Sequence, residues 1–270
     1  MRMKARRRMY PTRGGRRSGG TITLFRQDIP VAKFTALSIQ DRYCLLLMGH
    51  IHDELSWLQR MAYIASRSEP GSSREANSAN MMQALLVSRL FLGKLHEFYV
   101  VFRDVPALRL FVEAHYSTTP GAGAVKVADI EASFNSHVWL RTARNQSFLH
   151  YPTLGQATPT LEDPNVVWDL EIIHGRKTAN TMYPTADVFA NLHWFKIANP
   201  QDAMGGLAGA LDAAKGLALL VMQTLEQTIG NFVHRNLQDL SSHEVIRLPV
   251  RDSIYDVRID YFMNVEPRRA

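Results

Sequence analysis

Apolar residues recur at intervals of three, four and eight positions along residues 36–67, which is the spacing of one face of an α-helix. The positions are Leu37, Leu45, Met48, Ile51, Leu55, Leu58 and Met61. Residues 74–103 show the same pattern with Met82, Leu85, Leu86, Leu90, Leu95, Phe98 and Tyr99. Serine, proline and glycine between the two stretches interrupt a helix. The pattern therefore predicts two long helices joined by a short turn.

Two further helices are predicted in the middle of the chain. Residues 105–116 form a short one that opens at Pro106 and is followed by a glycine-containing loop. The next helix is predicted from about residue 125 to His150. Its apolar positions are Val127, Ile130, Phe134, Val138, Phe148 and Leu149. Pro152 ends this helix, because the residue before a proline is pushed out of the helical region.

The second half of the chain mixes helical and extended patterns. The assigned segments are an irregular stretch at 154–184, a strand or short helix within it at 166–173, and helices at 186–197 and 205–240. Residues 244–248 and 255–262 alternate apolar and polar side chains, which predicts a small β-hairpin. The fold class is therefore mainly α, an up-and-down helical bundle with a small C-terminal β-hairpin.

The composition narrows the class of protein. With 270 residues, 46% of them apolar and 21% charged, the chain can bury a sizeable core. Its single cysteine, Cys44, excludes an internal disulfide framework and a zinc site built on paired cysteines. We expect a cytoplasmic protein. The longest apolar stretch, residues 204–222, is interrupted by Asp212 and Lys215, so we expect no membrane association.

The positive charge of the chain is concentrated at its start. The formal net charge is +6, yet residues 1–20 contain eight basic side chains and no acidic one. The rest of the chain has 23 basic and 25 acidic residues, a net charge of −2. We therefore predict a disordered Arg/Gly-rich tail at 1–30, a helical bundle at 31–242, and a β-like tail packed on the bundle at 243–270. The basic tail either binds polyanions or comes from an upstream start codon, with Met9 as the alternative start of the protein.

Arg144, Asn145 and His150 form the most specific chemical pattern in the sequence. An arginine followed by a histidine five to seven positions later occurs three times, so that spacing alone carries no weight. An Arg-Asn dipeptide occurs only at 144–145 and 235–236, and only the first has a histidine in range. An arginine can hold a phosphate and a histidine can transfer protons, which is the chemistry of metal-free RNA cleavage.

This segment resembles the R-N-x4-H signature of the HEPN superfamily, a group of small helical bundles. The likeness covers seven residues, and the preceding pair of long helices is similar in outline. The resemblance implies a metal-independent endoribonuclease without cofactor, acting in toxin–antitoxin or phage-defence systems, with an antitoxin as a possible partner. It implies that Arg144 and His150 are catalytic, that Asn145 is the polar residue following the arginine, and that two protomers form a homodimer whose motifs line one cleft.

Helical geometry agrees with a need for two protomers. On an α-helix, Arg144 and His150 lie about 120° apart around the axis and about 9 Å apart along it. They do not share a face, so a second copy has to complete the site. Arg141, one turn earlier, adds positive charge and is a candidate substrate-binding residue. The reaction needs the RNA 2′-hydroxyl, so DNA is not expected to be cut.

Other readings and candidate sites remain open beside this one. The chain is alternatively a catalytically silent HEPN-like helical module that binds a partner protein or a nucleotide, or an RNA-binding protein that uses its basic tail. His50 and His52 do not predict a metal site, because residues two apart on a helix point in different directions. Asp53 or Glu54 is a candidate partner for the catalytic arginine.

Overall fold

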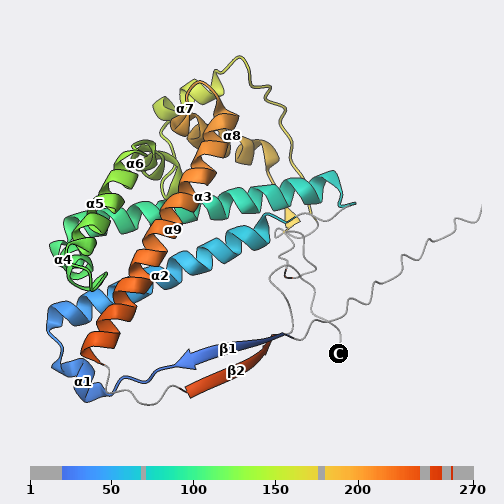
Figure 1. Ribbon diagram of the computed structural model, residues 1–270. Helices are drawn as coiled ribbons and strands as arrows, with labels where there is room; N and C mark the ends of the chain where they lie inside the picture. The colour runs from blue at the N-terminus through green and yellow to red at the C-terminus, as the bar shows by residue number, and fades with distance from the viewer. Residues whose placement is uncertain (1–19, 68–70, 176–179, 238–243, 251–256, 258–270) are drawn as a thin grey trace, which may run out of the picture. The chain divides into compact units, whose positions relative to one another are not determined.

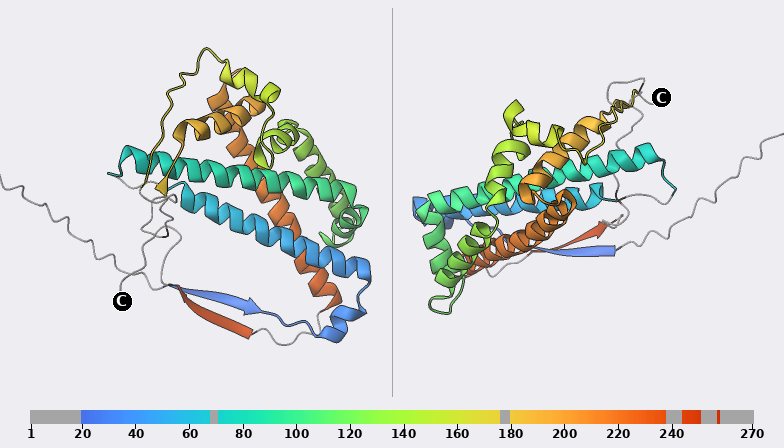
Figure 2. Two further views of the ribbon diagram at one scale, coloured as in Figure 1. Left: turned by 180° about the vertical axis from the view of Figure 1, so that it is seen from behind. Right: turned by 90° about the horizontal axis from the view of Figure 1, so that it is seen from above.

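The computed structural model describes residues 20–67, 71–175, 180–237, 244–250 and 257. These residues are mainly helical, and they divide into two compact units (Figures 1 and 2). One unit contains the two strands, which come from opposite ends of the chain, and the other contains the helices, within residues 28–241. Each unit is described by itself below.

The two long predicted helices are confirmed as an antiparallel pair, α2 (Ile39–Ala65) and α3 (Arg74–Asp104), which lie side by side (Figures 1 and 2). Each begins at a serine whose side chain accepts a hydrogen bond from a backbone N–H of the first turn, Ser38 for α2 and Ser73 for α3. Because Ser38 caps α2, the helix begins three residues later than the predicted start at residue 36, and a short helix that was not predicted, α1 (Val31–Ala36), precedes it. The buried faces of α2 and α3 form much of the core.

The helix α4 (Pro106–His115) opens at a proline as predicted, and α5 (Ala122–Asn135) follows after a turn. The turn passes through Gly121, whose φ of +79° favours glycine. Gly123 lets α5 approach α4, since a Cβ there would lie 2.3 Å from the carbonyl oxygen of Glu113. These glycines therefore serve the packing of two helices.

The predicted continuous helix from residue 125 to His150 is wrong. It is divided into α5, a short α6 (Trp139–Ala143) and a π-helical turn, η1 (Arg144–Phe148). In an α-helix, positions five apart differ by about 140°, so Ala143 and Phe148 would face different sides. In a π-helical turn the hydrogen bonds join residues five apart, and both side chains are buried. The wider turn thus keeps the apolar positions in the core.

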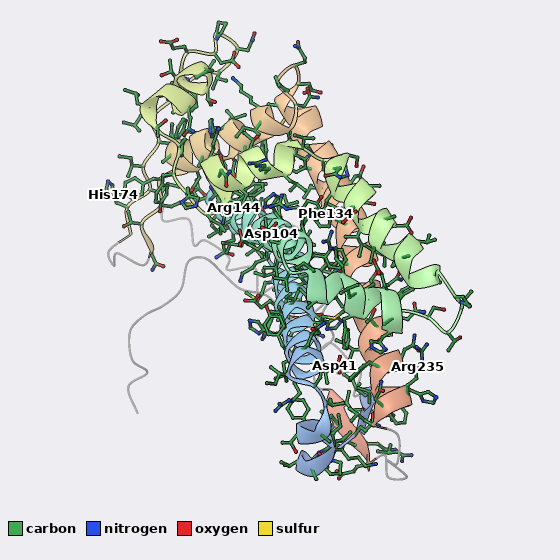
Figure 3. All side chains as sticks on the ribbon, turned by 90° about the vertical axis from the view of Figure 1, so that its left-hand side faces the viewer. Asp41, Asp104, Phe134, Arg144, His174 and Arg235 are labelled. Atoms are coloured by element: carbon green, nitrogen blue, oxygen red, sulfur yellow. The ribbon has the colours of Figure 1, made fainter. Side chains whose placement is uncertain are left out.

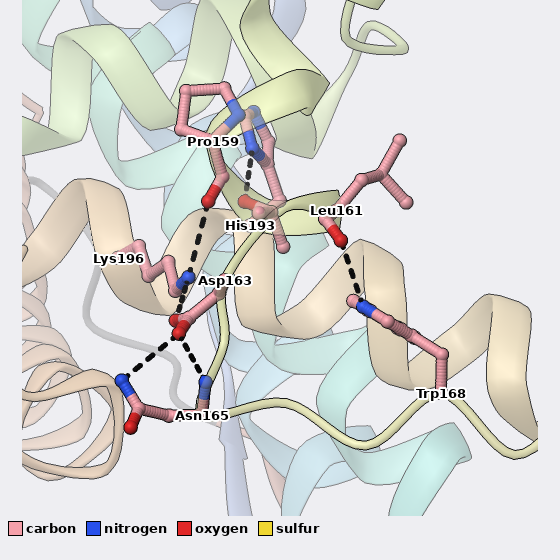
Figure 4. Close-up of polar contacts among 8 residues, drawn as sticks. Pro159, Leu161, Asp163, Asn165, Trp168, His193 and Lys196 are labelled. Atoms are coloured by element: carbon pink, nitrogen blue, oxygen red, sulfur yellow. Dashed lines mark hydrogen bonds and ion pairs between the residues drawn. The ribbon is translucent and has the colours of Figure 1, made fainter.

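A further helix, α7 (Leu154–Leu161), occupies part of the stretch predicted to be irregular. Thr153 and Gln156 form a capping box at its start, a signal that the sequence carried and that Pro159 obscured. The helix is joined to α8 (Pro184–Ala198) by a polar network (Figure 4). In it, Lys196 pairs with Asp163, and Thr160 lies 3.3 Å from Nδ1 of His193.

Most of the segment at 166–173 is neither strand nor helix; Ile173 alone forms an antiparallel bridge with Met182. The predicted helices at 186–197 and 205–240 correspond to α8 and to the long α9 (Ala203–Asn236). Residues 238–240 of the second prediction lie outside the described residues. The two helices predicted in the second half of the chain are therefore present as α8 and α9.

The helix α9 crosses the α2–α3 pair obliquely (Figure 1) and packs against α2, α4 and α8. An 18-residue window of α9 has a mean hydropathy of 1.4, and 39% of that window is buried in the structure. Length and composition alone would allow it to cross a membrane, and a buried core helix meets the same criterion. The feature is therefore weak evidence for a membrane span.

The two strands, β1 (Gly20–Arg26) and β2 (Glu244–Val250), pair in antiparallel register, with Ile22 opposite Leu248. The strand predicted at 244–248 is confirmed, but its described partner is β1, in the stretch predicted to be disordered. Ile22, Leu24, Ile246 and Leu248 lie on one face of the ribbon, whereas Phe25 and its partner Val245 lie on the other. Residues 1–19, and 255–262 apart from Val257, lie outside the described residues.

Candidate functional site

Arg144 is the first residue of the π-helical turn η1, which packs against the middle of α3. The backbone N–H of Leu149 reaches the carbonyl oxygen of Arg144 at 3.5 Å, which closes the wide turn. Phe148 anchors the turn in the core, where its ring meets Trp194 edge-on at 5.6 Å between centroids. On α3, a Cβ added to Gly93 would lie 3.5 Å from side-chain atoms of Phe148 and Leu149, so the two elements are close here.

Arg144 is labelled in Figure 3. Its guanidinium group is held on two sides. Its Nε and one terminal nitrogen each lie 2.6 Å from Oε1 of Glu97 on α3, and its other terminal nitrogen donates to Oδ1 of Asn145 at 2.9 Å. The two charged side chains are 29% and 34% exposed, so the pair lies at the edge of the core. Arg144 is therefore an oriented cation with part of its surface open to solvent.

In the structure Arg144 donates a hydrogen bond to Asn145, its neighbour in the motif, and pairs with Glu97, a carboxylate that sequence reasoning missed. We expected Asp53 or Glu54 to pair with the arginine, and this is wrong. Glu54 binds Nζ of Lys94 at 2.9 Å and 3.1 Å, and Asp53 lies 3.7 Å from His52. No local spacing relates residues 97 and 144, so only the packing of η1 on α3 shows their pairing.

His150 lies beyond the helical segment, because η1 ends at Phe148 and Leu149 is its cap. The predicted position in the last turn of an α-helix is therefore wrong, and the 120° separation from Arg144 no longer applies. The side chain of His150 is exposed. Its neighbour Tyr151 is 97% exposed. In the part of the chain that the structure describes, His150 makes no hydrogen bond or ion pair with Arg144 or Asn145.

A second histidine, His96, lies near Arg144. Unlike the exposed His150, it is buried. It precedes Glu97 on α3 and is only 9% exposed, and its Nδ1 has no hydrogen-bond partner in the structure. Burial lowers the pKa of His96, the positive charge of Arg144 lowers it further, and Glu97 acts in the opposite direction. Arg141 is exposed and also lowers this pKa, so it contributes positive charge to the same region.

A groove of about 250 Å³ runs between α2 and α3 beside this cluster. Its apolar lining consists of Leu47, Ile51, Leu55, Phe98 and Val101, and its polar lining of His50, Glu54, Lys94 and Glu97. Nε2 of His50 lies 3.8 Å from Glu54, which itself pairs with Lys94. Glu97 belongs both to the groove and to the ion pair with Arg144, so the two features are contiguous.

A larger hollow, of about 510 Å³, lies elsewhere on the helical unit between α9 and residues of the α4–α5 region. It is lined by Tyr116, Lys126, Leu220, Gln223, Thr224, Glu226 and Gln227. Lys126 lies 5.5 Å from the centre of the Tyr116 ring and binds Asp129 at 3.1 Å. This hollow shares no lining residue with the groove or with the predicted motif.

Metal-ligating side chains are scattered among the described residues, and no group of three of them is placed to hold an ion. The chemistry that the arrangement offers is therefore carried by Arg144. A guanidinium oriented by two side chains can bind the oxygens of a phosphate or carboxylate, provided that Glu97 gives up its place to the ligand. No family model, no curated protein and no solved structure matches this chain.

Proposed function

We propose that this protein is a HEPN-like, metal-independent endoribonuclease that acts as a homodimer in the cytoplasm. The observation that carries the proposal is the orientation of Arg144 between Glu97 and Asn145 at a π-helical turn. Such turns are rare and are found frequently at functional sites. The toxin–antitoxin or phage-defence context, and an antitoxin partner, follow from the resemblance and belong to the same proposal.

In the proposed reaction, Arg144 binds the scissile phosphate and stabilises the charge that develops on it. The ring of His150 takes the proton of the 2′-hydroxyl, and the 2′-oxygen attacks phosphorus. The bond to the 5′-oxygen breaks, and a protonated histidine supplies the proton of the leaving hydroxyl. The products are a 2′,3′-cyclic phosphate and a free 5′-hydroxyl, without any metal or oxidant. Arg141 adds positive charge for the backbone of the RNA.

A second copy is needed because one chain does not join the two catalytic groups. His150 and Tyr151 are exposed, and Leu154 beside them is 78% exposed, which suits a surface that a second protomer covers. In a two-fold arrangement each scissile phosphate then receives Arg144 from one protomer and His150 from its partner. The surface around His150 thus becomes part of the site only in the dimer.

The test is RNA cleavage in EDTA by the wild type and by Arg144→Ala and His150→Ala. We expect losses of about 100-fold or more in each, the scale of removing a charge-stabilising group or a general acid. Arg109→Ala is the matched control, since Arg109 is similarly exposed and pairs with Glu131 at 3.3 Å away from the site. Retained cleavage in both motif variants would rule out the assignment.

Mixing the two inactive variants tests the shared site. If each phosphate uses groups from two protomers, half of the dimers are mixed and each has one intact site. We then expect about a quarter of the wild-type activity to return. No recovery after subunit exchange, verified by differently tagged chains, would place both groups in one chain.

The alternative is a catalytically silent helical module that binds a partner protein or a nucleotide. It is favoured by the full engagement of Arg144 with Glu97 and Asn145, and by the net charge of −2 outside residues 1–20. Absence of cleavage by the wild type, with RNA or nucleotide binding retained, would support this alternative over the nuclease.

A further inference from the structure

We propose that the groove between α2 and α3 binds the nucleotide next to the phosphate held by Arg144, with its base on the apolar lining and its phosphate at Lys94. This inference rests on the proposed function, because it assigns a place to the neighbouring part of the same RNA chain. Binding of a nucleotide in the groove can also be measured with an RNA that cannot be cleaved, independently of nuclease activity.

The first argument is contiguity. Glu97 lines the groove and binds Arg144 at 2.6 Å, so the guanidinium lies one side chain away from the groove. Lys94 precedes Glu97 by three positions on α3, and residues three apart are neighbours on a helix surface. Lys94 therefore lies in the groove lining, and Arg144 lies next to it, bound to the lining residue Glu97. Successive phosphates of a single strand present charges in the same kind of row.

The second argument is the match of size and surface. The groove holds about 250 Å³, below the range of about 300–1,000 Å³ typical of pockets for drug-sized ligands, and suited to a flat base. Leu47, Ile51 and Val101 offer apolar contact to the face of a ring. Single-stranded bases are bound through their faces, in a sequence-tolerant way, by stacking on aromatic side chains, and the lining contains one such residue, Phe98. An apolar floor with cations along one rim therefore fits a nucleotide better than a purely apolar or purely charged ligand.

The third argument concerns what occupies the cations in the free protein. Lys94 binds Glu54 at 2.9 Å, and Arg144 binds Glu97. His50 lies 3.8 Å from the same carboxylate of Glu54. Lys94 and Glu54 are 42% and 33% exposed, and ion pairs at such positions contribute little stability, so a phosphate can displace the carboxylate. Glu54 therefore acts as an internal competitor of the phosphate.

This competition predicts the direction in which two substitutions change the affinity for the nucleotide. Lys94→Gln removes the cation and weakens binding of a nucleotide. Glu54→Gln removes the competitor and strengthens it. If the groove serves only for packing, neither change should affect RNA binding. If the groove binds a cation instead, Lys94→Gln should strengthen binding of the ligand and Glu54→Gln should weaken it.

The experiment measures binding of a labelled single-stranded RNA whose 2′-hydroxyls are replaced by fluorine, so that it cannot be cleaved by 2′-oxygen attack. Fluorescence anisotropy with the full chain gives the dissociation constant. We expect Lys94→Gln and the groove-filling Val101→Trp each to weaken binding about tenfold, the scale of one base contact. We expect Glu54→Gln to tighten binding severalfold.

Matched controls come from other surfaces of the helical unit. Lys126→Gln removes a lysine that is likewise paired with a carboxylate, and Leu219→Trp adds a ring on α9 at a side chain that is 57% exposed. Both should bind the probe as the wild type does. Circular dichroism and urea unfolding verify that each variant is folded before its binding is compared.

The outcomes separate this inference from the proposed function. Unchanged binding in Lys94→Gln and Val101→Trp, or weaker binding in Glu54→Gln, overturns the nucleotide groove whether or not ordinary RNA is cleaved. The expected order of affinities establishes the groove even if unmodified RNA stays intact, in which case the nuclease proposal alone fails.

Discussion

The two ends of the Arg144–His150 segment differ in how the fold treats them. At one end, Arg144 is held by Glu97 of α3 and by Asn145, above a buried phenylalanine. At the other end, His150 follows the cap of the π-helical turn and is exposed beside Tyr151. Five residues thus separate a side chain that is held by tertiary contacts from one that is exposed to solvent.

The difference teaches that a short motif is not one structural unit. The first half of the segment is built into the core, where α3 supplies a carboxylate and a buried histidine next to the arginine. The second half keeps Phe148 in the core and then leaves the core at Leu149 and His150, which are exposed.

Phe148→Ala should destabilise the helical unit by about 3–5 kcal/mol, because it removes a buried ring that meets Trp194. Tyr151→Ala, three residues on and 97% exposed, should change stability by less than about 0.5 kcal/mol. Urea unfolding of both variants measures the contrast. Similar losses of unfolding free energy in the two variants would contradict the placement of Phe148 in the core and Tyr151 on the surface.

Substitutions at Gly93 test how closely η1 packs against α3. Gly93→Leu should cost about 1–3 kcal/mol by overpacking against Phe148 and Leu149. Gly93→Ala should stabilise by up to about 1 kcal/mol, since its Cβ would stand at 3.5 Å, an ordinary contact, and alanine favours the helix. Thermal unfolding distinguishes the two. A stabilising leucine would contradict the close approach.

The buried histidines predict a dependence of stability on pH. Burial lowers the pKa of His96, His115 and His193, so the unfolded chain takes up protons more readily than the folded one. Their contribution to stability is full above the ordinary histidine pKa of about 6.5 and is lost as the pH falls below it. We expect the free energy of unfolding to decrease from pH 7.5 to pH 5.5.

Replacing His96 by leucine should make that decrease shallower, because one of the three groups no longer titrates. Phe91→Leu is the control, since it alters a buried side chain of the same helix that does not titrate, and it should leave the slope unchanged. An equal reduction of the slope in both variants would show that titration of His96 does not contribute to the pH dependence of the free energy of unfolding.

The smallest expected effect is on the electrostatics around Arg144. Glu97→Gln should cost less than about 1 kcal/mol of stability, because the pair is partly exposed. The same change should lower the pKa of His96, and Arg144→Gln should raise it, since the two charges act on it with opposite sign. NMR titration of the His96 ring measures both. Shifts of the same sign would show that these charges do not face His96.

Much of the helical framework could be predicted from local patterns. The periodic apolar positions and the intervening breakers located α2 and α3 to within a few residues, and Pro106 marked the start of α4. The capping box of Thr153 and Gln156 was also present in the sequence. These features are local because a helix satisfies its backbone groups within a few residues.

The candidate site was predicted in part. The Arg-Asn dipeptide pointed to Arg144 and Asn145, which the structure joins. The role of Glu97 and the burial of His96 were not visible, because they depend on where η1 meets α3, 47 residues away along the chain from Glu97 to Arg144. The pairing of β1 with β2 likewise joins residues 20–26 to 244–250, which alternation alone cannot match.

The residue pattern alone was enough to show that the protein is mainly helical and where its longest helices lie, and it singled out Arg144 and Asn145. Three features became visible only in the tertiary structure. The helix widens into a π-helical turn at Arg144, Glu97 orients the Arg144 guanidinium, and His150 lies beyond the end of that turn. The physical reason is that helices form from neighbouring residues, whereas the burial of Phe148 and the charge partner of Arg144 depend on packing between distant segments.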